Sequence, residues 1–232
     1  MTYTFTSLGD RAVMIEAASE IGSDAQRQVR MITALLESES PSWVLEYIPA
    51  FTTVAIFYDP MLLTYRLAVQ QLQTLLNRLA ENRLPAARTI EIPVCYGGEF
   101  GPDLAFVASH NNLTEEDVIR LHTSGEYSVY MIGFAPGFPF LGGMPEQIAA
   151  PRKDSPRLRI PERTVGIAGK QTGIYPIETP GGWQLIGRTP LRLFLPENEV
   201  PSLLQAGDSI TFKEISKDEY YAYKEQSHAE DQ

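Results

Sequence analysis

Cysteine, long apolar runs and excess positive charge are all missing or scarce in this chain of 232 residues. Its single cysteine, Cys95, excludes an intramolecular disulfide and a cysteine-based metal site. Cys95 lies in the apolar run TIEIPVCYG, so we interpret it as a small buried residue rather than a nucleophile. No apolar run approaches the roughly 20 residues of a membrane span, and the first residues lack the pattern of a signal peptide. We therefore expect a soluble cytoplasmic protein.

The charge and the absent motifs exclude further classes. A formal net charge of −10 and a pI near 4.8 leave no basic face large enough for a nucleic acid. Only three histidines occur, and no two of them have metal-ligand spacing on one helix, so we predict no metal site. The loop at Gly169 and Lys170 is not a phosphate loop, because Thr164 replaces the first glycine and Gln171 replaces the Ser/Thr.

Glycine and proline are concentrated in residues 133–190, which hold 10 of the 17 glycines and 9 of the 17 prolines. Apolar and aromatic residues are interleaved with them, which is typical of short strands joined by fixed turns rather than of disorder. Residues 152–192 also carry eight Lys/Arg against three Asp/Glu, a charge of +5 on an otherwise acidic chain. This ordered basic stretch indicates a site for a small anion.

The order of elements predicts an α+β N-terminal domain followed by a mainly-β barrel. Strands are expected at residues 2–6, 12–16, 43–49, 52–58 and 89–94, with helices at 23–37 and 59–82. Strand, helix, strand, strand, helix, strand is the ferredoxin-like split βαβ pattern. We place the domains at residues 1–88 and 89–216, with a linker near 84–87 and a short helix and tail at 217–232. Residues 89–94 could belong to either side of the linker.

The second domain is predicted to close into a small barrel. Short helices are expected at residues 104–110 and 114–123, the second of them capped by Thr114 and Asp117. Strands follow at residues 127–132, 189–195 and 208–215, and β-rich segments in series favour a closed barrel for residues 89–216.

The best ligand loop is residues 169–173, where glycines allow close approach and Lys170 and Gln171 offer donors. A plain hairpin is the alternative. Tyr175 presents a hydroxyl nearby, and Trp183 follows a tight turn, where core packing would explain it equally well. Arg188 is a fork-shaped donor on a strand and suits a carboxylate.

Two groups of residues have open interpretations. His110 and Asp103 could cap a helix or act in catalysis. The aromatic residues Phe134, Phe138 and Phe140 could be core or, if exposed, a partner surface. His122 is better explained as a buried, hydrogen-bonded histidine than as a general base.

The strings GFAPGFPFLGGMPE and IPERTVGIAGKQTGIYPIETPGGWQLIGRTP resemble the KipI / allophanate hydrolase subunit 1 family. The similarity extends upstream through IEIPVCYGGEFGPDL, and it covers residues 89–213 strongly. The resemblance implies a cyclophilin-like barrel and a component of an ATP-dependent 5-oxoprolinase, which opens 5-oxoproline to L-glutamate. The expected partners are a PxpA-like (LamB/YcsF) subunit and a PxpC-like subunit. The alternatives that the family implies are a KipI-type inhibitor of a sporulation histidine kinase and an allophanate or urea carboxylase-related subunit.

The resemblance also guides the expected roles. Arg188, Lys170 and Gln171 would hold the substrate carboxylate and a developing oxyanion, with Trp183 beside them and Tyr175 orienting. His110 or Asp103 would carry the proton. Because the chain has no nucleotide motif of its own, we expect ATP with Mg on the complex, mainly on another subunit.

Overall fold

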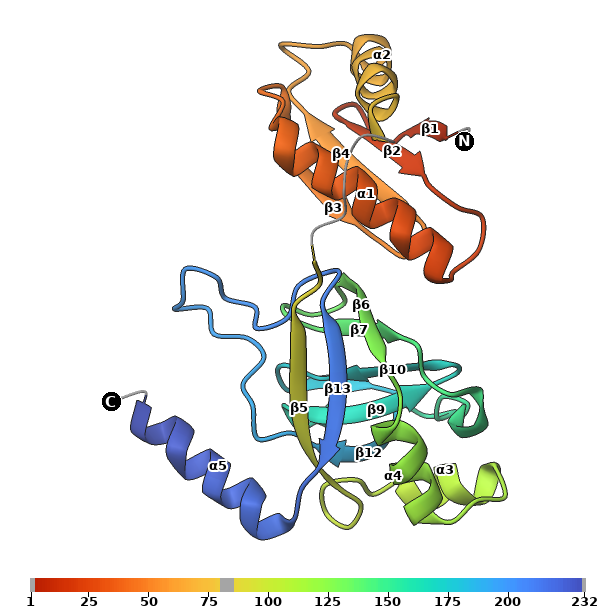
Figure 1. Ribbon diagram of the computed structural model, residues 1–232, viewed down its shortest axis with the longest axis vertical. Helices are drawn as coiled ribbons and strands as arrows, with labels where there is room; N and C mark the ends of the chain where they lie inside the picture. Colours follow the sequence, from red (N-terminus) through yellow and green to blue (C-terminus); the bar gives the residue numbers. More distant parts are fainter. Residues whose placement is uncertain (1–2, 80–85, 231–232) are drawn as a thin grey trace. The chain divides into compact units, whose positions relative to one another are not determined.

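The computed structural model describes residues 3–79 and 86–230 (Figure 1). The chain divides into two compact units, Met1–Ala86 and Ala87–Gln232. Two residues of the predicted linker, Leu84 and Pro85, lie outside the described residues. Within the described ranges, no helix is both long and apolar enough to cross a membrane.

The first unit is an antiparallel sheet covered by two helices. Its strands are β1 (Thr4–Ser7), β2 (Ala12–Glu16), β3 (Val44–Pro49) and β4 (Thr53–Tyr58), in the order β1-β2-β4-β3. The helix α1 (Ser23–Glu39) joins β2 to β3, and α2 (Tyr65–Leu76) follows β4. Alternate residues of β2 and β4, such as Ile15 and Ile56, pack against apolar faces of both helices, such as Ile32 and Leu72.

The mixed α+β character of the chain is confirmed, but the full ferredoxin-like description is not. The predicted sixth element, residues 89–94, lies in the second unit, and the sheet position beside β2 is taken by β1 instead. Two neighbouring β-rich segments compete for that edge, and local sequence patterns do not decide which of them pairs with β2.

Helix α1 begins at residue 23 as predicted, whereas α2 begins later than predicted. The N-cap of α1 is Gly22, and no side chain caps this helix. Asp59 closes a turn instead of starting a helix, since its Oδ1 accepts a hydrogen bond from Met61 N at 2.8 Å. The second helix starts after Thr64, whose hydroxyl caps it. The predicted helix end, Asn82, lies outside the described residues.

The second unit is built on a closed barrel of seven strands, as predicted. The strands are β5 (Thr89–Tyr96), β6 (Tyr127–Ile132), β7 (Pro139–Gly142), β9 (Thr164–Ala168), β10 (Gln171–Ile174), β12 (Gln184–Arg188) and β13 (Ser209–Glu214). The ring runs β10-β7-β6-β13-β5-β12-β9 and closes through the β9–β10 hairpin. The pair β5–β13 is parallel, whereas the other pairs are antiparallel.

A buried histidine lies in the barrel core, as predicted for His122. It is 0% exposed, and its Nδ1 lies 2.7 Å from the hydroxyl of Tyr96. Its Nε2 lies 3.1 Å from Thr172 Oγ1, which itself donates to Gly166 O. The threonine proton is therefore used, so Nε2–H donates to Thr172 and Nδ1 accepts from Tyr96. Burial lowers the pKa of His122 to about 3, which keeps the ring neutral.

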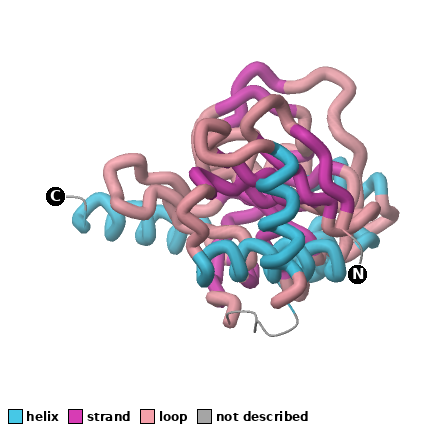
Figure 2. Tube along the Cα trace, turned by 90° about the horizontal axis from the view of Figure 1, so that it is seen from above, coloured by secondary structure: helices cyan, strands magenta, loops and turns pink. Residues whose placement is uncertain are grey.

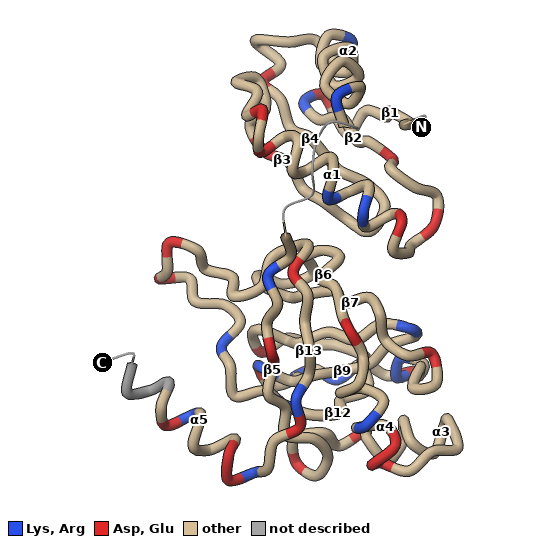
Figure 3. Tube along the Cα trace, viewed as in Figure 1, with Lys and Arg blue, Asp and Glu red and all other residues tan. Residues whose placement is uncertain are grey.

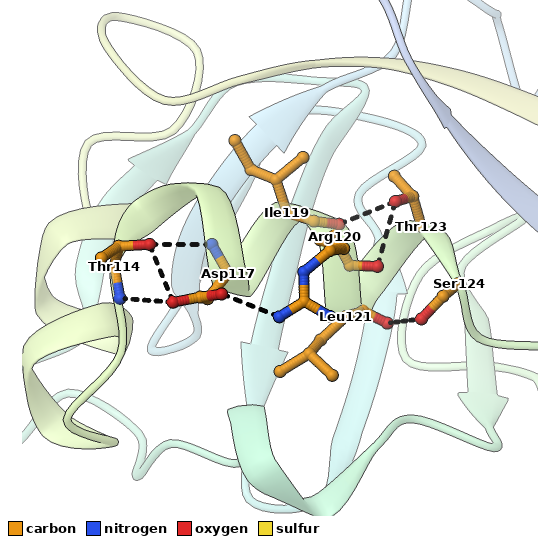
Figure 4. A network of polar contacts seen from close by, with 7 residues as sticks. All are labelled: Thr114, Asp117, Ile119, Arg120, Leu121, Thr123 and Ser124. Carbon is orange, nitrogen blue, oxygen red and sulfur yellow. Dashed lines mark hydrogen bonds and ion pairs between the residues drawn. The ribbon is translucent and has the colours of Figure 1, made fainter.

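Two short helices, α3 (Leu104–His110) and α4 (Glu115–Thr123), have the predicted limits. Thr114 Oγ1 accepts from Asp117 N at 3.1 Å, and the Asp117 carboxylate accepts from Thr114 N and from Arg120 (Figure 4). This confirms the predicted capping box, which is a local arrangement that needs no distant partner.

The remaining elements lie outside the ring. They are the two-stranded ribbon β8 (Arg157–Ile160) with β11 (Thr179–Gly181), the 3₁₀ turn η2 (Glu146–Ile148) and α5 (Lys217–Glu230). The strand predicted at residues 189–195 is wrong: that segment is irregular, and Pro190 lacks the N–H that a ladder requires. The tail is helical to Glu230, and α5 runs away from the strands toward the C-terminus (Figures 1 and 2).

Candidate functional site

An aromatic cluster packs within the second unit beside β7 and β12. Phe138, Tyr175 and Trp183 are 1%, 1% and 5% exposed, and their ring centroids lie 5.2 to 6.3 Å apart. The rings meet edge to face, an arrangement that adds about 0.5–1.5 kcal/mol per pair beyond the area buried. Tyr175 and Trp183 therefore lie side by side beneath the surface, and we call them the aromatic wall.

Only part of the predicted aromatic surface is on the surface. Phe138 is a core residue, which corrects its prediction as a partner contact, and Phe140 is half-buried against the same cluster. Phe134 is 66% exposed and has a left-handed φ of 67°. Its ring lies 5.4 Å from that of Phe138, so one face is held while the other meets solvent.

Asp103 is a buried carboxylate with two cations. Its Oδ1 accepts from Arg157 Nη2 at 2.7 Å and lies 3.5 Å from Lys153 Nζ, while Oδ2 accepts from Leu185 N at 2.7 Å. Burial acts to raise the pKa of Asp103, but these hydrogen bonds and charges outweigh it and hold the pKa below its usual range. The side chain forms no cap bond to α3, so the capping alternative does not describe it.

The Asp103 carboxylate and the aromatic wall are connected through residues 152 and 153. Lys153 N donates to Gly182 O, next to Trp183, and the guanidinium of Arg152 lies 6.0 Å from the Trp183 ring centroid. Burial raises the pKa of Tyr175 to about 12, against the opposing effects of the Trp183 N–H and two arginine charges. We call Arg152, Lys153 and Arg157 the basic cluster; together with Asp103 they carry a local charge of +2.

Sequence reasoning did not single out the basic cluster. The available signal was the excess of Lys and Arg in residues 152–192, which did not show which of them would meet Asp103. Arg157 Nη1 is buried and has no hydrogen-bond partner, as expected of a donor that awaits an acceptor.

The predicted ligand loop is a tight hairpin between β9 and β10. Gly169 adopts a left-handed φ of 58°, and Lys170 Nζ lies 2.8 Å from Glu146 Oε1. Both side chains are mostly exposed, so this ion pair contributes at most about 1 kcal/mol and leaves Lys170 able to exchange partners. Gln171 is half-buried at the start of β10.

Arg188 lies in a different environment, at the end of β12. Its guanidinium carbon is 5.9 Å from the Phe100 ring centroid, and the Phe100 ring lies 4.7 Å from that of Tyr220 in α5. Its predicted companions Tyr175 and Trp183 pack with the basic cluster instead.

His110 is exposed at the C-terminal end of α3, where its ring stacks on Phe106 with centroids 5.8 Å apart. Asp103 precedes the same helix, so the two predicted proton carriers stand at opposite ends of α3, about 10 Å apart along its axis. They do not form one catalytic pair.

A family model described as carboxyltransferase domain, subdomain C and D, matches residues 3–204 of the chain. The B component of 5-oxoprolinase from Bacillus subtilis is 51% identical over 97% of this chain and 98% of its own length. The protein of the same name from Escherichia coli O157:H7 is 44% identical over 88% of this chain and 93% of its own. The crystal structure of a conserved uncharacterized protein from Pyrococcus horikoshii is 45% identical, with a TM-score of 0.57, and covers 94% of this chain and 100% of that one.

Proposed function

Because this chain belongs to the carboxyltransferase subdomain C and D family and, within it, to the 5-oxoprolinase B components, we propose that it is the B component of an ATP-dependent 5-oxoprolinase. The complex opens the lactam 5-oxoproline to L-glutamate and acts in the cytoplasm. The observation that carries the proposal is the 51% identity to the Bacillus subtilis protein over almost the full length of both chains.

The chemistry sets what the site must supply. Ring opening adds water to the lactam carbonyl, breaks the C–N bond and returns a proton to the nitrogen. The substrate keeps its carboxylate throughout, and negative charge develops on the carbonyl oxygen. The carboxylate therefore requires cations, and the carbonyl oxygen requires hydrogen-bond donors. Residues 152–192, which are rich in Lys and Arg, offer both.

We propose the following roles for the predicted site residues. Arg188 holds the substrate carboxylate from a rigid strand. Lys170 and Gln171 lie at the opposite end of β9 from Thr164, the strand partner of Arg188, which is about 20 Å along the strand. They could therefore donate to a developing oxyanion only on a different ligand from the one that Arg188 holds. Tyr175 and Trp183 do not contact the substrate, because both are buried; they hold the basic cluster in place.

The two predicted proton carriers, Asp103 and His110, have different roles. The lowered pKa of Asp103 keeps it ionised and acceptor-only, so it positions Arg157 and Lys153 rather than giving up a proton. His110 is the proposed proton carrier. Since it is exposed, a neighbouring subunit is needed to bring the substrate to it.

The exposed positions of Lys170, His110 and Phe134 support a site completed by other chains, for which we propose PxpA-like and PxpC-like subunits. The hairpin at Gly169 does not fit a nucleoside triphosphate, because it is a tight turn and lacks the first glycine and the Ser/Thr of a phosphate loop. We therefore propose that ATP with Mg binds mainly on another subunit.

The test is reconstitution. The chain is co-purified with the candidate PxpA-like and PxpC-like subunits, and ATP-dependent glutamate formation from 5-oxoproline is measured. Activity is expected only in the full set, and Arg188→Ala is expected to raise KM strongly, while the exposed, paired Arg159→Ala leaves it unchanged. A full set that binds together but releases no glutamate would overturn the proposal.

A further inference from the structure

One oxygen of Asp103 is shared by two of the three cations in the basic cluster. Its Oδ1 accepts a hydrogen bond from Arg157 Nη2 at 2.7 Å, and Lys153 Nζ lies 3.5 Å from the same atom. The other oxygen, Oδ2, is engaged by the backbone of β12, because it accepts from Leu185 N at 2.7 Å. Among the described residues, the Lys153 ammonium group makes this ion pair but no hydrogen bond, so its N–H donors are unused.

Donors of the two arginines are unused as well. Arg157 Nη1 is buried and has no hydrogen-bond partner, so Asp103 engages only part of this guanidinium. The Arg152 guanidinium carbon lies 6.0 Å from the Trp183 ring centroid, and within residues 3–79 and 86–230 no carboxylate forms an ion pair with it. A contact with a ring face attracts the cation but accepts none of its N–H groups in the plane of the fork. The basic cluster therefore offers more donors than the described residues supply acceptors.

The backbone of the basic cluster is fixed from beneath. Gln184, which is 3% exposed, donates from Nε2 to Pro151 O at 2.8 Å, and Lys153 N donates to Gly182 O at 2.8 Å. These bonds hold the residues on both sides of Arg152, whose side chain is exposed, and the side chain of Lys153 is 33% exposed. A site whose backbone is ordered before binding loses less entropy when a ligand arrives.

The basic cluster is a local surplus of positive charge on an acidic chain. Both signs of charge occur in both units (Figure 3), and the whole chain carries −10. The three cations and Asp103 sum to +2. Asp154 is exposed in the same loop but, among the described residues, forms no ion pair with the cluster, so it uses none of the donors. A surplus of this size suits a phosphate group, which carries about −1.5 to −2 at pH 7, better than a singly charged carboxylate.

We propose that the basic cluster is a binding site for a phosphate group. Arg152 and Lys153 donate to its oxygens from the exposed side, and Arg157, which Asp103 holds in place, adds its charge beside them. A phosphate group has three strong acceptor oxygens and satisfies donors from two side chains at once. The identification of this phosphate with the one that ATP releases during ring opening rests on the proposed function, but the binding of phosphate does not.

The experiment titrates the full chain with sodium phosphate and, separately, with sodium 5-oxoproline, both at pH 7 and constant ionic strength. Calorimetry gives the affinities, and NMR follows the indole N–H signal of Trp183 in a Trp43→Phe background. We expect this signal to shift and to saturate with phosphate, because Arg152 turns from the ring toward the anion. The carboxylate of 5-oxoproline should bind about tenfold more weakly or not at all, since it brings less charge and fewer acceptor oxygens.

Variants assign the binding to named side chains. Lys153→Gln and Arg152→Gln replace side chains at the surface, so both should stay folded and bind phosphate about fivefold more weakly or worse. The matched control is Lys213→Gln, which removes an exposed cation that is paired with Glu91 on the same unit and should leave the affinity within about twofold.

Three results would overturn the inference. The first is no saturable response to phosphate at millimolar concentrations, and the second is tighter binding of 5-oxoproline than of phosphate. The third is an equal loss of affinity in Lys213→Gln and Lys153→Gln, which would show a general attraction between charges and no site. None of these results depends on glutamate formation by the reconstituted complex, which tests the proposed function separately.

Discussion

Acid should weaken the barrel unit through one buried histidine. His122 is 0% exposed and neutral, since its two nitrogens are fully used by Tyr96 and Thr172. Its pKa in the folded protein is about 3, because burial penalises the charged ring, whereas an unfolded histidine titrates near 6.5. In mild acid, His122 therefore binds a proton when the protein unfolds, whereas it stays neutral in the folded state.

The sign and the size follow from this difference. The folded pKa lies below the unfolded one, so the stabilisation is fully present above about pH 6.5 and is lost as the pH falls toward 3. Each pH unit in this window costs about 1.4 kcal/mol per group. Between pH 7 and pH 5 the unit should lose about 2 kcal/mol through His122 alone, which is a large share of a typical domain stability.

The assay uses the two tryptophans, one in each unit, at Trp43 and Trp183. A Trp43→Phe background leaves Trp183 as the reporter of the barrel unit, and its fluorescence follows denaturant unfolding at pH 7 and pH 5. The loss between these two pH values should be about 2 kcal/mol larger than in a His122→Gln variant, which cannot titrate. The exposed His110→Gln is the matched control and should keep the full loss.

Equal losses in the unaltered chain and in His122→Gln, with both folded at pH 7, would refute the reasoning. So would an NMR titration in which the ring of His122 takes up its proton near pH 6.

Three further predictions concern stability and are measured by denaturant unfolding. Trp183 is the reporter for every variant of the barrel unit, whereas Gly22→Ala is followed in the first unit. Gly101→Ala should destabilise the barrel unit by about 3 kcal/mol or more, because the added Cβ would overlap the carbonyl oxygen of Ile186 in β12. The control is Gly22→Ala, which has open space around it and should change the stability of the first unit by less than about 1 kcal/mol. Phe138→Ala should cost about 3–5 kcal/mol and the exposed Phe134→Ala under about 1, and similar costs would contradict the core assignment. Asp103→Ala should cost roughly 2–4 kcal/mol because it leaves two cations unpaired, and a neutral result would show that the carboxylate anchors nothing.

Elements that depend on neighbouring residues were predictable. The start of α4 and the capping box of Thr114 were found from the sequence because the cap bonds join residues only three positions apart. Asp59 shows the limit of such rules. It was a plausible helix start, but Thr64 offered a second cap five residues later, and the packing of the helix face decided between them.

The site was predictable in composition and not in arrangement. Lys170, Tyr175, Trp183 and Arg188 were found as residue types, yet the structure groups Tyr175 and Trp183 with a basic cluster and Arg188 with α5. The aromatic run beginning at Phe134 was undecided because periodicity does not tell a surface ring from a buried one in a turn-rich segment.

By itself, the sequence determined that this is an α+β chain with a closed barrel and which family it resembles; that its chemistry lies in the basic, glycine-rich stretch stays a prediction. All of these follow from residue types and short spacings. Tertiary structure alone decided that Asp103 meets Arg157 and Leu185, which lie 54 and 82 positions away in the chain. It also decided that Phe100 contacts both Arg188 of β12 and Tyr220 of α5. Such contacts are set by how strands close around a barrel, and a local pattern carries no record of them.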